Sequence, residues 1–284
     1  MFTDRRSTHQ MWRGRPGVGA AHVGPDSVQV TRCRPVGPAG PWWPVLLLLL
    51  VVTACAGGRS DGAEVAPPST TSPPRNVVPG SEGVEVPSLV ARAVGPVALF
   101  VEPNAAEPLD ILESTTSYGS PRVLLVSQTV GDWHRVLLPG RPNGSSAWVR
   151  DDDVVLTRVN QRLEVDLTEM TLTLYEGDRE ILVSPVAVGS AQNPTPTGLY
   201  YITDKIRPAA GEVSAYGPFA LGLSAHSETL TEFAGGEGQI AVQGTNDEST
   251  IGQRVSHGSI RVPNETIIRL AEMLPLGVPV VIVP

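Results

Sequence analysis

Cysteine is scarce in this chain of 284 residues: Cys33 and Cys55 are the only two. The sequence after Cys55 therefore offers neither a disulfide nor a thiol nucleophile. Basic residues are also few, with 21 Lys and Arg against 29 Asp and Glu, and the formal net charge is −8. An acidic chain without a basic patch repels nucleic acid, so no nucleic-acid partner is predicted.

The main apolar run is short. It extends from Val45 to Ala54, which is too short to span a bilayer but has the length of a signal-peptide hydrophobic region. It closes on the letters VTAC, which resemble the bacterial lipobox, where a cysteine after small residues is lipidated and becomes the N-terminus. Residues 1–54 are thus predicted to be a lipoprotein signal region, with Val30 as the start from an alternative start codon. The alternative is a plain secretory signal in which Cys55 follows by coincidence.

Cleavage before Cys55 changes both the charge and the thiol content of the chain. It removes six basic and two acidic residues, which leaves 15 basic residues, 27 acidic residues and a formal charge of −12. Cys33 is lost with the signal and Cys55 carries the lipid, so the mature chain has no free thiol. Residues 55–91 are rich in Pro, Ser, Thr and Gly without apolar periodicity, which predicts a linker. The expected location is the outer face of the bacterial cell membrane, at the cell wall.

Residues 92–158 read as short strands separated by turn signals such as Pro142-Asn143-Gly144, which indicates a small β-barrel or sandwich. The stretch GDWHRVLLPGRPNGSSAWV resembles bacterial SH3-like modules. In that resemblance Trp133 and Trp148 pack the barrel core; the alternative is that they line a ligand groove.

Residues 160–284 are long enough for a core of their own. Three strand-like runs open this segment, residues 205–238 read as an irregular surface loop or lid, and two further strands follow. The run NETIIRLAEML predicts the main helix, with Asn264 as its cap and Pro275 and Gly277 after its end. A final buried strand, VPVVIV, completes a mainly β chain.

Near the C-terminus, RVSHGSIRV alternates polar and small or apolar residues. In an extended strand this spacing places His257, Ser259 and Arg261 on one face.

The order and spacing of motifs over residues 160–284 resemble the YkuD-type catalytic domain of L,D-transpeptidases. The resemblance implies a YkuD-type β-sandwich with one main helix after the SH3-like module. It also implies peptidoglycan stem peptides as ligands, and a cysteine thiolate that takes an acyl group from one stem and passes it to an amine of another. The family's Ser/Thr-His-Gly-Cys-hydrophobic-Arg/Asn motif is matched by Ser256, His257, Gly258, Ile260 and Arg261.

Two positions of that family motif differ here. Ser259 stands at the cysteine position and Gln243 stands at the upstream histidine position. A hydroxyl is a poor nucleophile without a base within hydrogen-bond reach, and an amide accepts no proton at useful pH. Because general-base catalysis supplies about 10²–10⁴-fold, the loss of both groups predicts that cysteine-based cross-linking is lost or strongly reduced.

Other polar residues keep two interpretations each. His257 either orients the strand through backbone hydrogen bonds or serves as a base. His226, in the expected lid, is not favoured as a substitute base, and His134 belongs to the other module. The resemblance implies that Gly258 and Arg261 bind substrate. The Arg261 guanidinium either holds a stem carboxylate or pairs with Glu265. No metal-ligand spacing is present, and no cofactor or oligomeric state is predicted.

Three hypotheses of function follow. The first is an envelope lipoprotein that binds peptidoglycan stems without cysteine chemistry. The second is an active transpeptidase or peptidase that uses Ser259 as its nucleophile. The third is a non-catalytic structural lipoprotein that binds partner proteins.

Overall fold

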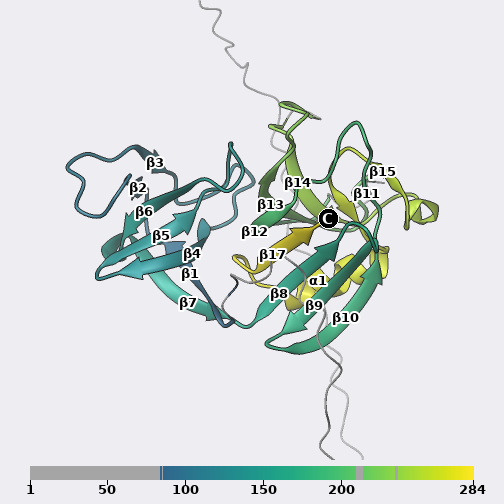
Figure 1. Cartoon of the computed structure of the whole chain (residues 1–284), viewed down its shortest axis with the longest axis horizontal. Coiled ribbons are helices and arrows are strands. Elements are labelled where there is room, and N and C mark those ends of the chain that lie inside the picture. Colours follow the sequence, from purple (N-terminus) through teal and green to yellow (C-terminus); the bar gives the residue numbers. More distant parts are fainter. Residues whose placement is uncertain (1–83, 85, 209–213, 234–235) are drawn as a thin grey trace, which may run out of the picture. The chain divides into compact units, whose positions relative to one another are not determined.

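The computed structural model of the protein describes residues 84, 86–208, 214–233 and 236–284 (Figure 1). The described residues all fall within one compact unit, Ser69–Pro284. The predicted signal region, Cys55 and most of the predicted linker lie outside the described residues. None of the helices in the described ranges is long and apolar enough to cross a membrane. Strands dominate and one α-helix is present in these ranges, which confirms the mainly β prediction.

The N-terminal module is built on a five-stranded antiparallel sheet in the order β6-β5-β4-β1-β7. Its first strand begins at Ser88, so the folded module starts before Arg92. A short hairpin, β2–β3, accompanies the sheet. The SH3-like identity of this module stays a prediction. Its strands are β1 (Ser88–Ala93), β2 (Val97–Leu99), β3 (Asp110–Leu112), β4 (Val123–Val130), β5 (Trp133–Leu137), β6 (Ser146–Arg150) and β7 (Val154–Val159).

The two tryptophans of this module are half-buried and pack beside Phe100. The ring of Trp133 meets that of Phe100 edge to face, with centroids 5.1 Å apart at 89°. The guanidinium of Arg150 lies 4.8 Å from the Phe100 ring centre and 5.4 Å from that of Trp133. Trp148 pairs with Phe100 through the backbone. These contacts give the ring of Trp133 a packing role in the module, whereas Trp148 is tied to Phe100 through its backbone.

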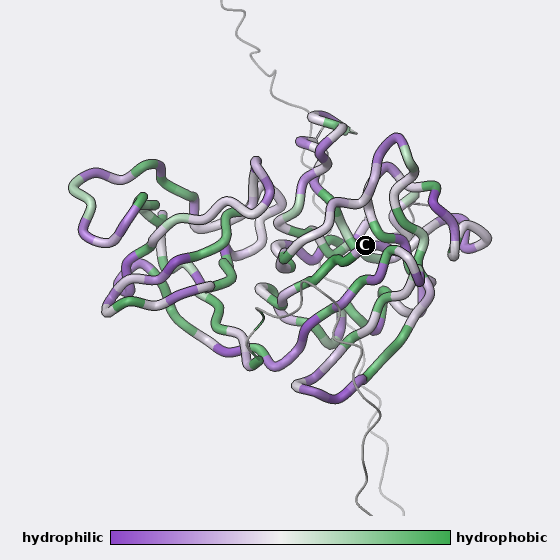
Figure 2. Tube along the Cα trace, viewed as in Figure 1, coloured by the Kyte–Doolittle hydropathy of each residue, from purple (hydrophilic) through white to green (hydrophobic). Residues whose placement is uncertain are grey.

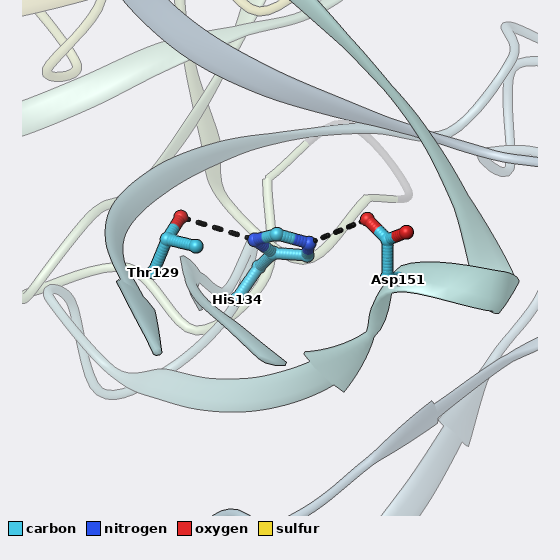
Figure 3. A network of polar contacts seen from close by, with 3 residues as sticks. All are labelled: Thr129, His134 and Asp151. Atoms are coloured by element: carbon cyan, nitrogen blue, oxygen red, sulfur yellow. Dashed lines mark hydrogen bonds and ion pairs between the residues drawn. The ribbon is translucent and has the colours of Figure 1, made fainter. Parts of the chain in front are cut away.

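His134 is part of a polar network inside the N-terminal module (Figure 3). Its Nδ1 lies 3.1 Å from Thr129 Oγ1, on the neighbouring strand β4, and its Nε2 lies 2.9 Å from Asp151 Oδ1. The imidazole is buried, with 2% of its residue surface exposed. Thr129 and His134 are direct partners in the β4–β5 ladder, so the network fixes that hairpin to the turn at Asp151. Both ring nitrogens of His134 therefore contact residues of its own module.

The C-terminal domain is built on an eight-stranded sheet in the order β10-β9-β8-β17-β12-β13-β14-β16. The opening meander and the final strand confirm the sequence prediction, and β17 pairs in parallel with β8. All five residues of β17 are buried, and the strands carry the hydrophobic segments of the trace (Figure 2). The elements are β8 (Gln161–Asp166), β9 (Thr171–Glu176), β10 (Arg179–Pro185), β11 (Val188–Gly189), β12 (Gly198–Ile206), β13 (Ala220–His226), β14 (Gln239–Gln243), β15 (Arg254–Ser256), β16 (Ile260–Arg261), α1 (Asn264–Met273) and β17 (Pro279–Val283).

The helix is present where the sequence predicts it, but its predicted cap is wrong. Asn264 is the first residue of α1, and Pro263 occupies the cap position without a side-chain hydrogen bond. The Asn264 side chain instead bonds the backbone of Thr245, accepting from its N–H at 3.0 Å and donating to its carbonyl at 2.9 Å. Asn264 therefore holds the loop after β14 against the helix start.

The expected irregular loop over residues 205–238 is also wrong in part. Strand β13, Ala220–His226, lies within it, and all seven of its residues are buried. It is paired on both sides, with β12 and with β14, so polar and apolar residues need not alternate along it. His226 is thus not a lid residue but the last residue of an interior strand.

Burial of His226 makes the stability of the protein depend on pH. Its residue surface is 6% exposed, and its Nδ1 has no hydrogen-bond partner in the described part of the chain. Burial, followed by the charge of Arg141, lowers its pKa below the ordinary 6.5. Since the unfolded chain then takes up the proton first, stability should fall as pH drops below about 6.5 toward the lower folded pKa. The free energy of unfolding can be measured with denaturant at pH 7.5 and at pH 5.5, about one unit on either side of the ordinary histidine pKa. Between these two pH values, His226→Gln should lose less of that free energy than the unaltered chain. The exposed His257→Gln is the matched control. An equal loss in His226→Gln and the unaltered chain would contradict this assignment.

Candidate functional site

A cavity of about 100 Å³ lies at the edge of the large sheet, beside β14 and β16. It gathers four side chains that the sequence singled out, those of Gln243, His257, Ser259 and Arg261. Gly258, His226 and His134 do not line it. The described residues that line the cavity are Ala215, Tyr216, Ser227, Leu230, Phe233, Gly238, Gln239, Gln243, Ser256, His257, Ser259 and Arg261.

The motif that contains these residues is not one extended strand, so that prediction is wrong. The chain bends at His257 and Gly258, between β15 and β16. Gly258 has φ +114°, and a Cβ there would lie 2.8 Å from Ile240 Cδ1, so glycine suits this position both in conformation and in space. The bend leaves His257 exposed and Ser259 half-buried. His257 and Ser259 therefore reach the cavity from different parts of a turn, not from one strand face.

Hydroxyl groups hold this bend in place. Ser256 Oγ accepts from the Gly258 amide at 3.0 Å and donates to the Ser259 carbonyl at 2.6 Å. Thr195 Oγ1 donates to the Gly258 carbonyl at 2.7 Å and accepts from the Gly189 amide at 2.9 Å. These bonds satisfy the turn's buried backbone groups, which favours a single conformation at Ser259.

Within the described part of the chain, Ser259 Oγ has one hydrogen bond, which it accepts from the Ala241 amide at 3.2 Å. No imidazole nitrogen of a described residue bonds to this hydroxyl. The ring of His257 instead packs against that of Phe233, with centroids 4.9 Å apart and planes tilted by 30°. Thus His257 makes neither the expected backbone hydrogen bond nor a base contact among the described residues, and the hydroxyl lacks the partner that would take its proton.

Gln243 and Arg261 are direct partners in the parallel β14–β16 pair. Gln243 is buried. Arg261 is half-buried, and its Nε is fully covered and has no hydrogen-bond partner among the described residues. No ion pair to Glu265 occurs among the described residues, so the salt-bridge interpretation of Arg261 has no support there. A guanidinium with an unsatisfied buried donor beside a cavity favours an anionic ligand group.

The sequence did not indicate the remaining walls of the cavity. Leu230 and Phe233 lie in the stretch that reads as irregular, and Gln239 opens β14. The Gln239 amide is fixed by donating to Thr203 Oγ1 at 3.0 Å and to the Leu223 carbonyl at 2.8 Å. The polar alternation of GQIAVQG was the available signal, because it places Gln239, Ala241 and Gln243 on one face. Among the described residues no three His, Cys, Asp or Glu side chains lie close enough to hold a metal ion.

Comparison with known proteins assigns the C-terminal domain to a family. Residues 160–282 match the YkuD family model, the L,D-transpeptidase catalytic domain. A Bacillus licheniformis protein named for an L,D-transpeptidase, YkuD, is 35% identical over 123 residues, 43% of this chain and 66% of that protein. A Salmonella typhimurium protein named for an L,D-transpeptidase, ErfK/SrfK, is 28% identical over 207 residues, 68% of this chain and 65% of that protein. The chain thus spans just under two thirds of the length of each relative.

A solved L,D-transpeptidase from Mycobacterium smegmatis is also similar, at 14% identity over 66% of this chain and 100% of that chain, with a TM-score of 0.37. From the family match, residues 160–282 belong to the YkuD family of L,D-transpeptidase catalytic domains.

Proposed function

We propose that this chain is an exported envelope lipoprotein whose YkuD domain binds peptidoglycan stem peptides and does not cross-link them by cysteine chemistry. The observation that carries the proposal is that Ser259 and Gln243 line one cavity. The motif resemblance aligns these two residues with the family's cysteine and histidine. Among the described residues that line it, the cavity keeps groups that can bind a ligand but no pair of groups that activates a nucleophile.

The loss of chemistry follows from two coupled replacements. The hydroxyl of Ser259 accepts a backbone hydrogen bond and meets no described base. Gln243, which lines the same cavity and pairs with Arg261 across β14 and β16, exchanges hydrogen bonds but not protons. Nucleophile and base act as one catalytic unit. With both replaced, neither position supports the cysteine-based reaction by itself.

The binding role rests on Arg261. Stem peptides carry carboxylates, and a guanidinium can hold a carboxylate through two parallel hydrogen bonds. The covered, unpartnered Nε of Arg261 beside the cavity supplies the donor for such a contact. The lipid anchor at Cys55 belongs to the same proposal and would keep the domain at the membrane surface that faces the wall.

Replacement of Arg261 should weaken stem binding. Loss of a charged hydrogen bond costs about 1.5–3 kcal/mol, so Arg261→Ala should bind soluble tetrapeptide stems more than tenfold more weakly than the unaltered chain. Calorimetric titration measures the affinity, and thermal unfolding checks that the variant is folded. The exposed Arg269→Ala, on α1, is the matched control and should bind normally. Equal affinity of all three proteins would remove the binding role of Arg261.

Restoring the family residues should restore chemistry only when both are restored. Ser259→Cys supplies a thiol without a base, and Gln243→His supplies a base beside a poorly acidic hydroxyl. The double variant should exceed the product of the single effects, because groups of one catalytic unit are strongly non-additive. Carbapenem acylation and stem cross-linking, measured for the four proteins, give the comparison.

Two results of that comparison would overturn the proposal. Turnover by the unaltered chain that Ser259→Ala abolishes would establish a serine mechanism. An inert double variant would mean that the cavity differs from an active site in more than these two residues. Absence of any stem binding would instead favour a structural role with protein partners.

A further inference from the structure

We propose that Arg141, in the N-terminal module, is a positioning residue for the stem-binding cavity, because it fixes the segment that walls the cavity. This wall segment is Ser227–Phe233, which follows β13. The inference rests on the proposed function for what the cavity binds, but the positioning itself can be measured without a ligand.

One guanidinium joins the two ends of the loop that contains the wall segment. Arg141 Nη2 donates to the Ser227 carbonyl at 2.9 Å and to the Leu230 carbonyl at 2.8 Å. Its Nη1 donates to the Glu237 carbonyl at 2.7 Å. At the same place the Ser227 amide donates to the Gly238 carbonyl at 2.8 Å. Arg141 therefore supplies a cation to three backbone carbonyls that receive no other hydrogen bond from the described residues.

A second residue of the same turn reinforces this contact. Asn143 Nδ2 donates to the His226 carbonyl at 2.8 Å, and Asn143 Oδ1 accepts from the His226 amide at 2.9 Å. The side-chain amide thus completes the backbone bonding of the strand end from which the wall segment starts. The turn is closed by Ser145, whose amide and hydroxyl both donate to the Pro142 carbonyl.

The wall segment contributes directly to the cavity. Ser227, Leu230 and Phe233 line it, and the ring of Phe233 packs on that of His257. Elsewhere the segment is held by Thr229 Oγ1, which donates to Asn193 Oδ1 at 3.0 Å, and by the bonds that Ser227 Oγ accepts from the Thr229 and Leu230 amides. Arg141 thus supplies two of the hydrogen bonds that hold this segment from outside it, alongside the bond between Thr229 and Asn193 and the backbone bond from Ser227 to Gly238.

Loss of Arg141 should loosen the wall without unfolding the domain. Arg141 lies at the surface, so water can take over the three carbonyls once the guanidinium is removed. The cavity would then open more often, because local opening depends on local contacts and not on the global stability. In this arrangement the N-terminal module completes the binding site of the YkuD domain without lining it.

A single thiol measures the opening directly. In the full chain with Cys33→Ser and Cys55→Ser, the variant Ser259→Cys carries the only thiol, and its alkylation by N-ethylmaleimide reports access to the cavity. Adding Arg141→Ala should raise that rate about three- to tenfold, the range expected when roughly 1 kcal/mol of local stability is lost, with an unchanged unfolding midpoint. Asn143→Ala should raise the rate in the same direction. Arg135→Ala, which removes a bond from Arg135 Nε to Ser146 Oγ inside the N-terminal module, is the matched control and should leave it unchanged.

The outcomes separate this inference from the proposed function. Equal alkylation rates for Arg141→Ala, Asn143→Ala and the control would overturn the positioning role, whatever the chain binds. A raised rate together with weaker tetrapeptide-stem binding in Arg141→Ala would support both proposals. A raised rate in a chain whose unaltered form binds no stem would support the positioning role and overturn the proposed function.

Discussion

The bend at Gly258 is the constraint on which the candidate site depends. A left-handed glycine, packed against Ile240 and fixed by the hydroxyls of Ser256 and Thr195, turns the chain from β15 into β16. The parallel pairing of β16 with β14 then brings Arg261 opposite Gln243 and Ser259 beside Ala241. Residues 18 positions apart in sequence thereby share one cavity. Any residue larger than glycine would strain the turn and displace Ser259 from this arrangement.

Under the proposed function, the same arrangement would separate binding from chemistry. Binding needs donors and acceptors that match a ligand, and the cavity offers an amide, hydroxyls and the unsatisfied guanidinium of Arg261. Chemistry needs, in addition, a nucleophile that loses its proton in the transition state and a group that receives it. Ser259 and Gln243 meet the first requirement and not the second. Since the fold that positions them is retained, loss of cross-linking need not entail loss of recognition.

The sequence predicted the parts of the fold in which one local signal dominates. The meander from Gln161 to Pro185 alternates as a half-buried sheet does, and α1 has helical spacing. Strand β13 was missed because it is buried throughout, and Asn264 was misread as a cap because its amide bonds Thr245 instead. The prediction that the motif is one extended strand failed at Gly258. The positive φ of that glycine bends the chain, so side chains no longer alternate between two faces. The polar residues Gln243, His257, Ser259 and Arg261 were predicted as site residues, whereas the walls at Leu230, Phe233 and Gln239 were not. Arg141 was not predicted either, since a surface turn carries no signal of contacts made about 90 residues later.

The central claim is that the unaltered cavity binds stems but forms no covalent bond with them. Intact-protein mass spectrometry after prolonged incubation with tetrapeptide stems, at concentrations that saturate binding in solution, tests it most directly. The account predicts a bound fraction in the titration and only the unmodified protein mass. An added acyl mass that peptide mapping locates on Ser259 would contradict it.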